Sequence, residues 1–284
     1  MEVTMEIKAE SGREEKQSQR VRVFTAESQE VRIERAAMKN NIRIRSANLE
    51  NIRQIGEEAF MGCTCLQQVR LENLRRIEKR AFNGCSRLKT VQFPASIYKI
   101  LPGAFQNSKR LQSVVFRKSC GLKELENEVF SGCSGLLDVR LPGKLYRIGR
   151  KAFYKCISLE EIEFPISLRS IGQESFYQCG FRELELPEGL LEIGESAFLK
   201  CKNLEYVYVP DTVRKIGKWA FHGCSNLKVL EINHDPEEIG EWITNKVCTI
   251  RCPKGSKMEA YARHYGMSVE YTISAIDNSF PYPL

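Results

Sequence analysis

Apolar and polar residues alternate in short runs that recur along the chain at nearly constant spacing. Each run has the form Leu-x-x-Val-x-Leu, as in residues 66–71 and again, with a final Phe, in residues 88–93. An alternation with period two predicts a short β-strand with one apolar face. An Ala-Phe pair precedes each run, between an Ile and a Cys, and its four to six residues predict a turn or a single helical turn. Each copy of the pattern therefore predicts one strand and one turn.

The template Ile-x3-Ala-Phe-x2-Cys-x2-Leu-x2-Val-x-Leu-Pro repeats every 22 to 25 residues. Its Phe stands at positions 60, 82, 105, 130, 153, 176, 198 and 221. An earlier, disguised copy begins at Ile33, which makes nine copies, and a tenth begins at Ile239 and breaks down. A unit this short cannot bury a core alone, but stacked units cover one another's apolar side chains. The sequence therefore predicts a single α/β solenoid with a curved parallel sheet of short strands, nine repeats and capped ends.

This signature resembles the BspA-type (Treponema pallidum-type) leucine-rich repeats, over about Ile33 to Ile250. The resemblance implies a leucine-rich-repeat solenoid that binds other macromolecules, often in bacterial surface or host-interaction proteins. Two repeats depart from the common spacing. Two extra residues stand within 117–121, and one residue is missing at 179–181. We expect both to distort the stack locally without breaking it.

The ends of the chain predict caps for the solenoid. We expect a flexible arm over 1–20, a solenoid over 21–273 and a loose tail over 274–284. Within the solenoid, we expect an N-terminal cap at 21–32 with an edge strand, repeats at 33–238, and a degenerate coil with a helical cap at 239–273. Ser256 and Glu259 form a capping-box pattern, and Gly266 fits a helix stop. One apolar face of that helix would cover the last coil, and it comprises Met258, Tyr261, Ala262 and Tyr265.

Seven of the eleven cysteines occupy one position of the repeat, with Asn or Ser in the other copies. These residue types share small size and a hydrogen-bonding group, so we expect them to fill a tight inner turn and to donate to a carbonyl of the same or the adjacent coil. No Cys-x2-Cys pair and no recurring His accompany them, which argues against a metal site. A bridge between Cys248 and Cys252 stays open. The predicted ladder comprises Asn41, Cys63, Cys85, Ser108, Cys133, Cys156, Cys179, Cys201 and Cys224.

The residues that could carry catalysis do not form a recognisable constellation. The chain has three histidines, His222, His234 and His264, and none has a nameable Ser or Cys partner. The recurrent Ile-Gly is interpreted as a turn glycine of the coil, because no phosphate-binding glycine loop follows a strand. The sequence therefore predicts a non-catalytic protein without a cofactor or a metal.

Charge and cysteine content give only weak limits on partner and location. The net charge of +7 permits contact with polyanions without requiring it. The first residues show no secretory leader, and an odd number of cysteines does not suit a full disulfide framework. We expect a reducing, cytoplasmic setting, or the cell surface or secretion if a leader is missing from this chain.

The variable positions of each strand point away from the core and predict where a partner binds. In the first four repeats these positions are mostly uncharged, whereas the next three carry five carboxylates against one Arg, and two tyrosines follow. Like charges on neighbouring strands destabilise a sheet, so a basic protein or peptide is the predicted partner. The predicted binding residues are Asp138, Arg140, Glu161, Glu163, Glu183, Glu185, Tyr206, Tyr208, Val229 and Glu231.

Two other functions stay open. Lys and Arg on the convex side or the edges, such as Arg75, Arg76, Lys79 and Arg80, would bind a polyanion or nucleic acid. Adhesion at a bacterial surface is implied by the family resemblance alone. No membrane span and no small-molecule substrate are predicted.

Overall fold

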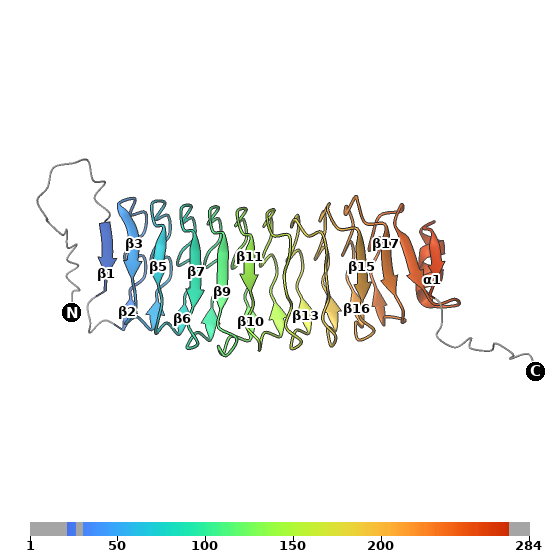
Figure 1. The fold of residues 1–284 in the computed structure, drawn as a ribbon, viewed down its shortest axis with the longest axis horizontal. Helices are drawn as coiled ribbons and strands as arrows, with labels where there is room; N and C mark the ends of the chain where they lie inside the picture. Colours follow the sequence, from blue (N-terminus) through green and yellow to red (C-terminus); the bar gives the residue numbers. More distant parts are fainter. Residues whose placement is uncertain (1–21, 27–30, 273–284) are drawn as a thin grey trace, which may run out of the picture.

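The chain winds into an elongated, nearly straight solenoid of about eleven turns (Figure 1). The computed structural model describes residues 22–26 and 31–272. The predicted parallel-strand solenoid is confirmed, but the prediction of nine repeats is slightly low. The count differs because both ends add turns, through residues 22–25 before the first repeat and residues 249–252 and 269–271 after the last. The predicted arm over 1–20 and the tail over 274–284 lie outside the described residues.

Strands with one exposed side follow each other along the rod, and we call their outward side the strand face (Figure 1). All pairs are parallel, in three sheets of order β1-β3-β5, β11-β9-β7 and β15-β17-β19-β20. Parallel pairing between successive copies is what a helical winding of identical units requires. The strands are β1 (Arg22–Thr25), β3 (Ile44–Asn48), β5 (Gln68–Arg70), β7 (Thr90–Phe93), β9 (Ser113–Phe116), β11 (Asp138–Arg140), β15 (Tyr206–Val209), β17 (Val229–Ile232), β19 (Thr249–Cys252) and β20 (Val269–Tyr271).

The prediction of a strand in every repeat is wrong for two consecutive coils. Around Glu163 and Glu185 the backbone forms only isolated bridges, Arg140 to Glu163 and Glu185 to Tyr208. Glu is a poor strand former, and both coils carry it at two outward positions. The missing residue at 179–181 lies in the second of these coils.

A second column of strands, each two residues long, was not predicted. It forms two parallel sheets, of order β2-β4-β6-β8 and β10-β12-β13-β14-β16-β18. The gap between these sheets falls at the longest repeat, which holds the two extra residues. The strands are β2 (Arg32–Ile33), β4 (Gln54–Ile55), β6 (Arg76–Ile77), β8 (Lys99–Ile100), β10 (Glu124–Leu125), β12 (Arg147–Ile148), β13 (Ser170–Ile171), β14 (Glu192–Ile193), β16 (Lys215–Ile216) and β18 (Glu238–Ile239).

A glycine follows six of the ten short strands and allows successive coils to touch there. A Cβ at Gly217 would lie 2.4 Å from the backbone nitrogen of Glu195, and one at Gly172 would lie 2.8 Å from the carbonyl oxygen of Ile148. The interpretation of the Ile-Gly glycine as a residue needed for turning is therefore incomplete. The glycine is needed because the backbone of the previous coil occupies the space of a side chain.

The core is organised by one continuous stack of phenylalanine rings. Rings of neighbouring coils lie 5.1 to 5.6 Å apart and within 21° of parallel. All of them are fully buried. Each ring between the two ends of the stack is covered above and below by the same residue of the adjacent coils, so these coils depend on their neighbours. The stack comprises Phe60, Phe82, Phe105, Phe130, Phe153, Phe176, Phe198 and Phe221.

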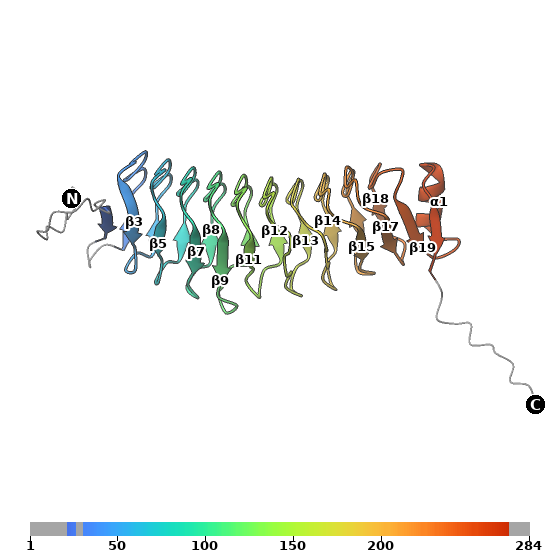
Figure 2. The ribbon, with the colours of Figure 1, turned by 45° about the horizontal axis from the view of Figure 1, so that its top comes forward.

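The C-terminal end is closed by helix α1 (Lys257–His264), which lies at the end of the stack (Figure 2). The Ser256 side chain accepts a hydrogen bond from the Glu259 amide, as the capping pattern predicts. The Glu259 carboxylate, however, accepts from the amide of Gly255 at 2.6 Å rather than from that of Ser256. Met258 and Ala262 are buried, which completes the cover over the last coil.

Replacing one ring of the stack should unfold the protein more easily. We expect Phe153→Ala to lower the free energy of unfolding by about 3–5 kcal/mol, because it leaves a cavity between two rings. The measurement is urea denaturation followed by circular dichroism. Ile166→Ala is the control, since that side chain is 76% exposed and its loss should change the free energy by less than about 0.5 kcal/mol. Equal losses for the two variants would contradict the ring stack as the main packing element.

The helical cap should lose stability in acid. The amide of Gly255, Arg263 and Tyr271 all donate to the carboxylate of Glu259, and these bonds lower its pKa from 4.5 to about 2. A lowered pKa stabilises the folded state above the unfolded value of 4.5, and this contribution is lost as the pH falls toward 2. We therefore expect the difference in melting temperature between the wild type and Glu259→Gln to shrink over that range. A constant difference across the same range would contradict this role, and Glu72→Gln serves as the neutral reference.

Candidate partner-binding face

The predicted binding residues lie in two files along the strand face. One file runs through Arg140, Glu163, Glu185, Tyr208 and Glu231, and the bridges and strand pairs place most of these directly beside one another. The other file stands two residues earlier in each coil. Seven of the ten side chains are exposed, and those of Tyr208, Val229 and Glu231 are half-buried. The other file comprises Asp138, Glu161, Glu183, Tyr206 and Val229.

Four carboxylates of this face carry uncompensated charge. No side-chain hydrogen bond or ion pair joins Glu161, Glu163, Glu183 or Glu185 to any residue that the structure describes. Asp138, by contrast, accepts a hydrogen bond from Ser113 at 3.1 Å. We call the four glutamates the acidic patch. Their charges are free to act on a partner, since no described side chain forms a hydrogen bond or an ion pair with them.

Carboxylates elsewhere on the rod are commonly paired between coils. Glu160 lies 3.2 Å from Arg182, and Glu174 lies 3.4 Å from Lys151. Such exposed pairs contribute little stability individually. These pairs neutralise the surface locally. The acidic patch therefore carries a net negative charge that the surface around such pairs lacks.

Tyr206 and Glu231 belong to a network that the sequence did not predict. The Tyr206 hydroxyl donates to Glu231 at 2.9 Å, and Arg251 bridges Glu231 and Glu270 at 3.0 Å each. Partial burial raises the pKa of Glu231, but hydrogen bonds from Asn233, Arg251 and Tyr206 outweigh it and leave the pKa below its ordinary value. Glu231 is thus held by internal partners and is less available than the acidic patch. The signal in the sequence was Arg251, one coil further on at the same strand position.

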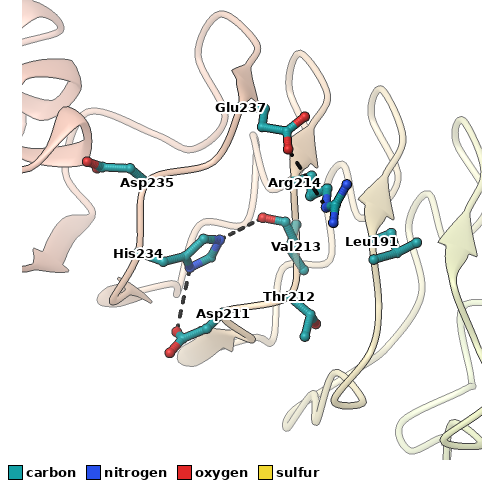
Figure 3. Close-up of a pocket in the computed structure, with 8 residues that line it drawn as sticks. All are labelled: Leu191, Asp211, Thr212, Val213, Arg214, His234, Asp235 and Glu237. Carbon is teal, nitrogen blue, oxygen red and sulfur yellow. Dashed lines mark hydrogen bonds and ion pairs between the residues drawn. The ribbon is translucent and has the colours of Figure 1, made fainter.

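A shallow recess spans three consecutive coils (Figure 3), and Tyr208 contacts one of the residues that line it. Its hydroxyl donates to Asp211 at 3.3 Å, and the same carboxylate lies 3.6 Å from Nδ1 of His234. Nε2 of His234 lies 2.6 Å from the carbonyl oxygen of Val213 and donates to it. The recess has a volume of about 370 Å³ and is lined by Leu191, Asp211, Thr212, Val213, Arg214, His234, Asp235 and Glu237.

The polar groups of this recess bind one another rather than converging on an open point. Arg214 lies 3.8 Å from Glu237, and the Thr212 hydroxyl donates to the carbonyl of Leu190. His234 therefore links two loops of adjacent coils. No Ser or Cys lines the recess beside the imidazole, and the hydroxyl of Thr212 also accepts a hydrogen bond from the amide of Gly189.

The other histidines also lie apart from any catalytic arrangement. Nδ1 of His222 lies 3.4 Å from the carbonyl oxygen of Thr244, and His264 is exposed on α1. Within residues 22–26 and 31–272, no three His, Cys, Asp or Glu side chains gather closely enough to hold a metal ion. In the same part of the chain, no helix has the length and apolar content to cross a membrane.

The predicted ladder lines the interior of the turns, and its members hydrogen-bond from one coil to the next. The Cys156 thiol donates to the carbonyl oxygen of Phe130 at 3.3 Å, and the Ser108 hydroxyl makes the same bond to Phe82 at 3.2 Å. Asn41 differs, because its side chain accepts from the amides of Arg43 and Ile44 within its own coil. The other thiols that donate in this way are Cys63, Cys85, Cys133, Cys179, Cys201 and Cys224.

Burial makes these thiols unreactive. It raises the pKa of Cys63 to about 11 and that of Cys133 to about 12, so both are protonated at neutral pH. All eleven cysteines lie among the described residues and are free, Cys248 and Cys252 included. Cys65 is the partly exposed one, while the other ten are buried.

The basic residues considered for polyanion binding lie at the short strand β6 and the turn after it. Arg76 is paired with Glu78 at 2.6 Å. Arg75, Lys79 and Arg80 are exposed. One member of this group is thus already neutralised, and the group is smaller than the sequence suggested.

Comparison with known proteins bears on the family and the fold. The model of the BspA type leucine-rich repeat region matches residues 31–159 and 147–254 in six copies. No curated protein matches the chain.

Among solved structures, the chain is similar to a leucine-rich repeat protein from Bacteroides ovatus. The TM-score is 0.61 and the identity 20%, over 88% of this chain and 92% of that one. It is also similar to the leucine-rich repeat protein of Treponema pallidum, with a TM-score of 0.41 and 23% identity over 87% and 85% of the two chains. The first similarity supports the fold.

We expect one thiol of the folded protein to react much faster than the other ten. We expect Ellman's reagent to modify about one thiol of the folded protein rapidly, Cys65, because the other thiols are buried. All eleven should react after unfolding in guanidinium chloride. Cys65→Ser should abolish the rapid phase. Rapid modification of several ladder thiols in the folded protein would contradict their assignment as sealed packing residues.

Proposed function

The chain belongs to the BspA-type leucine-rich-repeat family, and from this premise we propose that it binds a basic protein or peptide through its strand face. Proteins of this type are generally interaction or adhesion modules. The observation that carries the proposal is the acidic patch, four exposed carboxylates without partners on a chain whose net charge is +7. A cationic partner would gain attraction from each carboxylate without first breaking an ion pair.

The tyrosines beside the acidic patch support a protein partner. Tyr208 follows Glu185 in the same file through a backbone bridge, and Tyr206 is 44% exposed. Tyr supplies large contact area at low cost in side-chain entropy and is enriched at interface hot spots. The carboxylates would then attract the same partner that the tyrosines contact.

We also propose that the protein is not an enzyme. The polar groups of the recess at His234 are engaged with each other, and the ladder thiols are buried. A scaffold without a cofactor is consistent with both features. Free, oxidisable cysteines throughout the core favour a reducing compartment, and we propose a cytoplasmic location on that ground.

Polyanion binding by the group at β6 is the second candidate. Arg75, Lys79 and Arg80 are exposed and within one turn of each other. It is the weaker candidate, because Arg76 is already paired. The two candidates predict opposite ligand charges, which makes them separable.

Charge reversal in the acidic patch tests the proposal. We expect the protein to bind a labelled Arg/Lys-rich peptide, more weakly as salt is added, because exposed charges are screened. Glu161→Lys with Glu163→Lys should weaken binding at least about tenfold, or ~1.4 kcal/mol. Fluorescence anisotropy measures this affinity, with an oligonucleotide as the second ligand.

The matched control places the same charge change elsewhere. Glu72 and Glu195 are exposed and have no side-chain hydrogen bond or ion pair among the described residues. Glu72→Lys with Glu195→Lys should therefore change affinity less than about threefold, through net charge alone. Preference for the oligonucleotide, unchanged by the reversal at Glu161 and Glu163, would reject the proposed face in favour of the polyanion site.

A further inference from the structure

The strand face is interrupted at the centre of the acidic patch. Backbone bridges join Arg140 to Glu163 and Glu185 to Tyr208, but none joins Glu163 to Glu185. The strand order confirms the interruption, since one sheet ends at β11 and the next begins at β15. The coils on either side of the gap form no strand of their own.

The bridges across this file follow the signs of the charges. Arg140 faces Glu163, and further along Glu231 faces Arg251, which in turn faces Glu270. All of these opposite-charge pairs are joined by the backbone. Glu163 and Glu185 are the like-charged neighbours in this file, and Glu161 and Glu183 stand in the same relation two residues earlier. Like charges directly opposite one another destabilise strand pairing.

The core beneath the gap is less well covered than the core beneath β15. Phe164 is 9% exposed and Leu186 8%, whereas Val207 and Val209 in the intact strand β15 are fully buried. Closing the gap would cover these apolar side chains and add backbone hydrogen bonds. Burial and backbone hydrogen bonding therefore favour closure, and a repulsive force opposes it.

Two features of the sequence could cause the gap. One is repulsion between the glutamates, and the other is the residue missing at 179–181, which shifts Phe181 into the place of a leucine one residue early. A gap also separates β5 from β7, where Arg70 stands opposite Gln92 and no like charges meet. There, however, both segments remain strands, so the loss of strand on both sides is particular to the acidic patch.

We propose that repulsion among the four glutamates holds this gap open, and that neutralising them closes the strand face into a continuous sheet from β7 to β20 across these coils. The charged and titratable groups around the gap are Asp138 and Arg140 on one side, Glu188 and the hydroxyls of Tyr206 and Tyr208 on the other, and the pair of Glu160 with Arg182 beside it. None of them neutralises the patch. A cationic partner would supply the missing charge and would thereby order the coils that it contacts. That last step alone rests on the proposed function.

Hydrogen exchange of the full chain, read by mass spectrometry, tests the gap without any partner. In Glu163→Gln with Glu185→Gln, amides of residues 160–165 and 182–187 should exchange about fivefold more slowly than in the wild type, the size expected when like-charged cross-strand pairs are removed. The control Glu72→Gln with Glu195→Gln should leave them unchanged. A second variant inserts Ser after Gly180, which restores the spacing of the preceding repeat.

The outcomes separate the two causes and the two proposals. Slower exchange in the Gln variant supports repulsion as the cause. Unchanged exchange in the Gln variant, with slower exchange in the insertion variant, overturns it and assigns the gap to the missing residue. Unchanged exchange in both also overturns it. If the Gln variant closes the gap but the basic peptide leaves wild-type exchange unchanged and does not bind, the proposed function fails while the charge-held gap stands.

Discussion

Stacking between identical positions of successive coils is the interaction on which the rest of this structure depends. A coil of 22 to 25 residues has no interior of its own. Its Phe is covered by the Phe of the coil before and the coil after, and its ladder thiol donates to a carbonyl of the previous coil. Where a glycine follows a short strand, as at Gly172 and Gly217, the backbones of two coils approach especially closely. Translation from coil to coil therefore dictates which residues must be small, flat or apolar.

The same translation shapes the surface. Because neighbouring coils place equivalent residues side by side, a residue type that recurs at an outward position is multiplied into a file. Opposite charges in a file form pairs, as with Glu231 and Arg251, and like charges accumulate, as at Glu163 and Glu185. The strand face thus acquires its charge pattern from the order of the repeats, and the region of uncompensated charge coincides with the region where the sheet is weakest.

Much of the fold could be predicted because it depends on the regular spacing of apolar residues along the sequence. The recurrence of Phe and the alternation of Leu, Val and Leu predict the stack and most of the strands, and Ser256 with Glu259 predicts the capping helix.

The second column of strands was missed because two residues are too few to show a period. The strands at Glu163 and Glu185 were predicted wrongly, because the pattern within one repeat shows neither how the outward charges of adjacent coils meet nor what the residue missing at 179–181 does to the pairing. Pairings such as Tyr206 with Glu231 were missed for a related reason, since they depend on which side chains rotate toward each other across the file. The exposure of the predicted face follows from alternation, whereas its role in binding stays a prediction.

The column of buried thiols makes unfolding in an oxidising medium difficult to reverse. While the coils remain stacked, each sulfur is shielded by the turn above it and has no second sulfur bonded to it. Once the rod has come apart in an oxidising medium, eleven mobile sulfurs can couple in many wrong combinations. Any such crosslink ties together coils that must lie in order, so the chain could not rewind until a reductant cut it. The ladder that lets the coils pack so closely thus makes refolding dependent on a reducing environment.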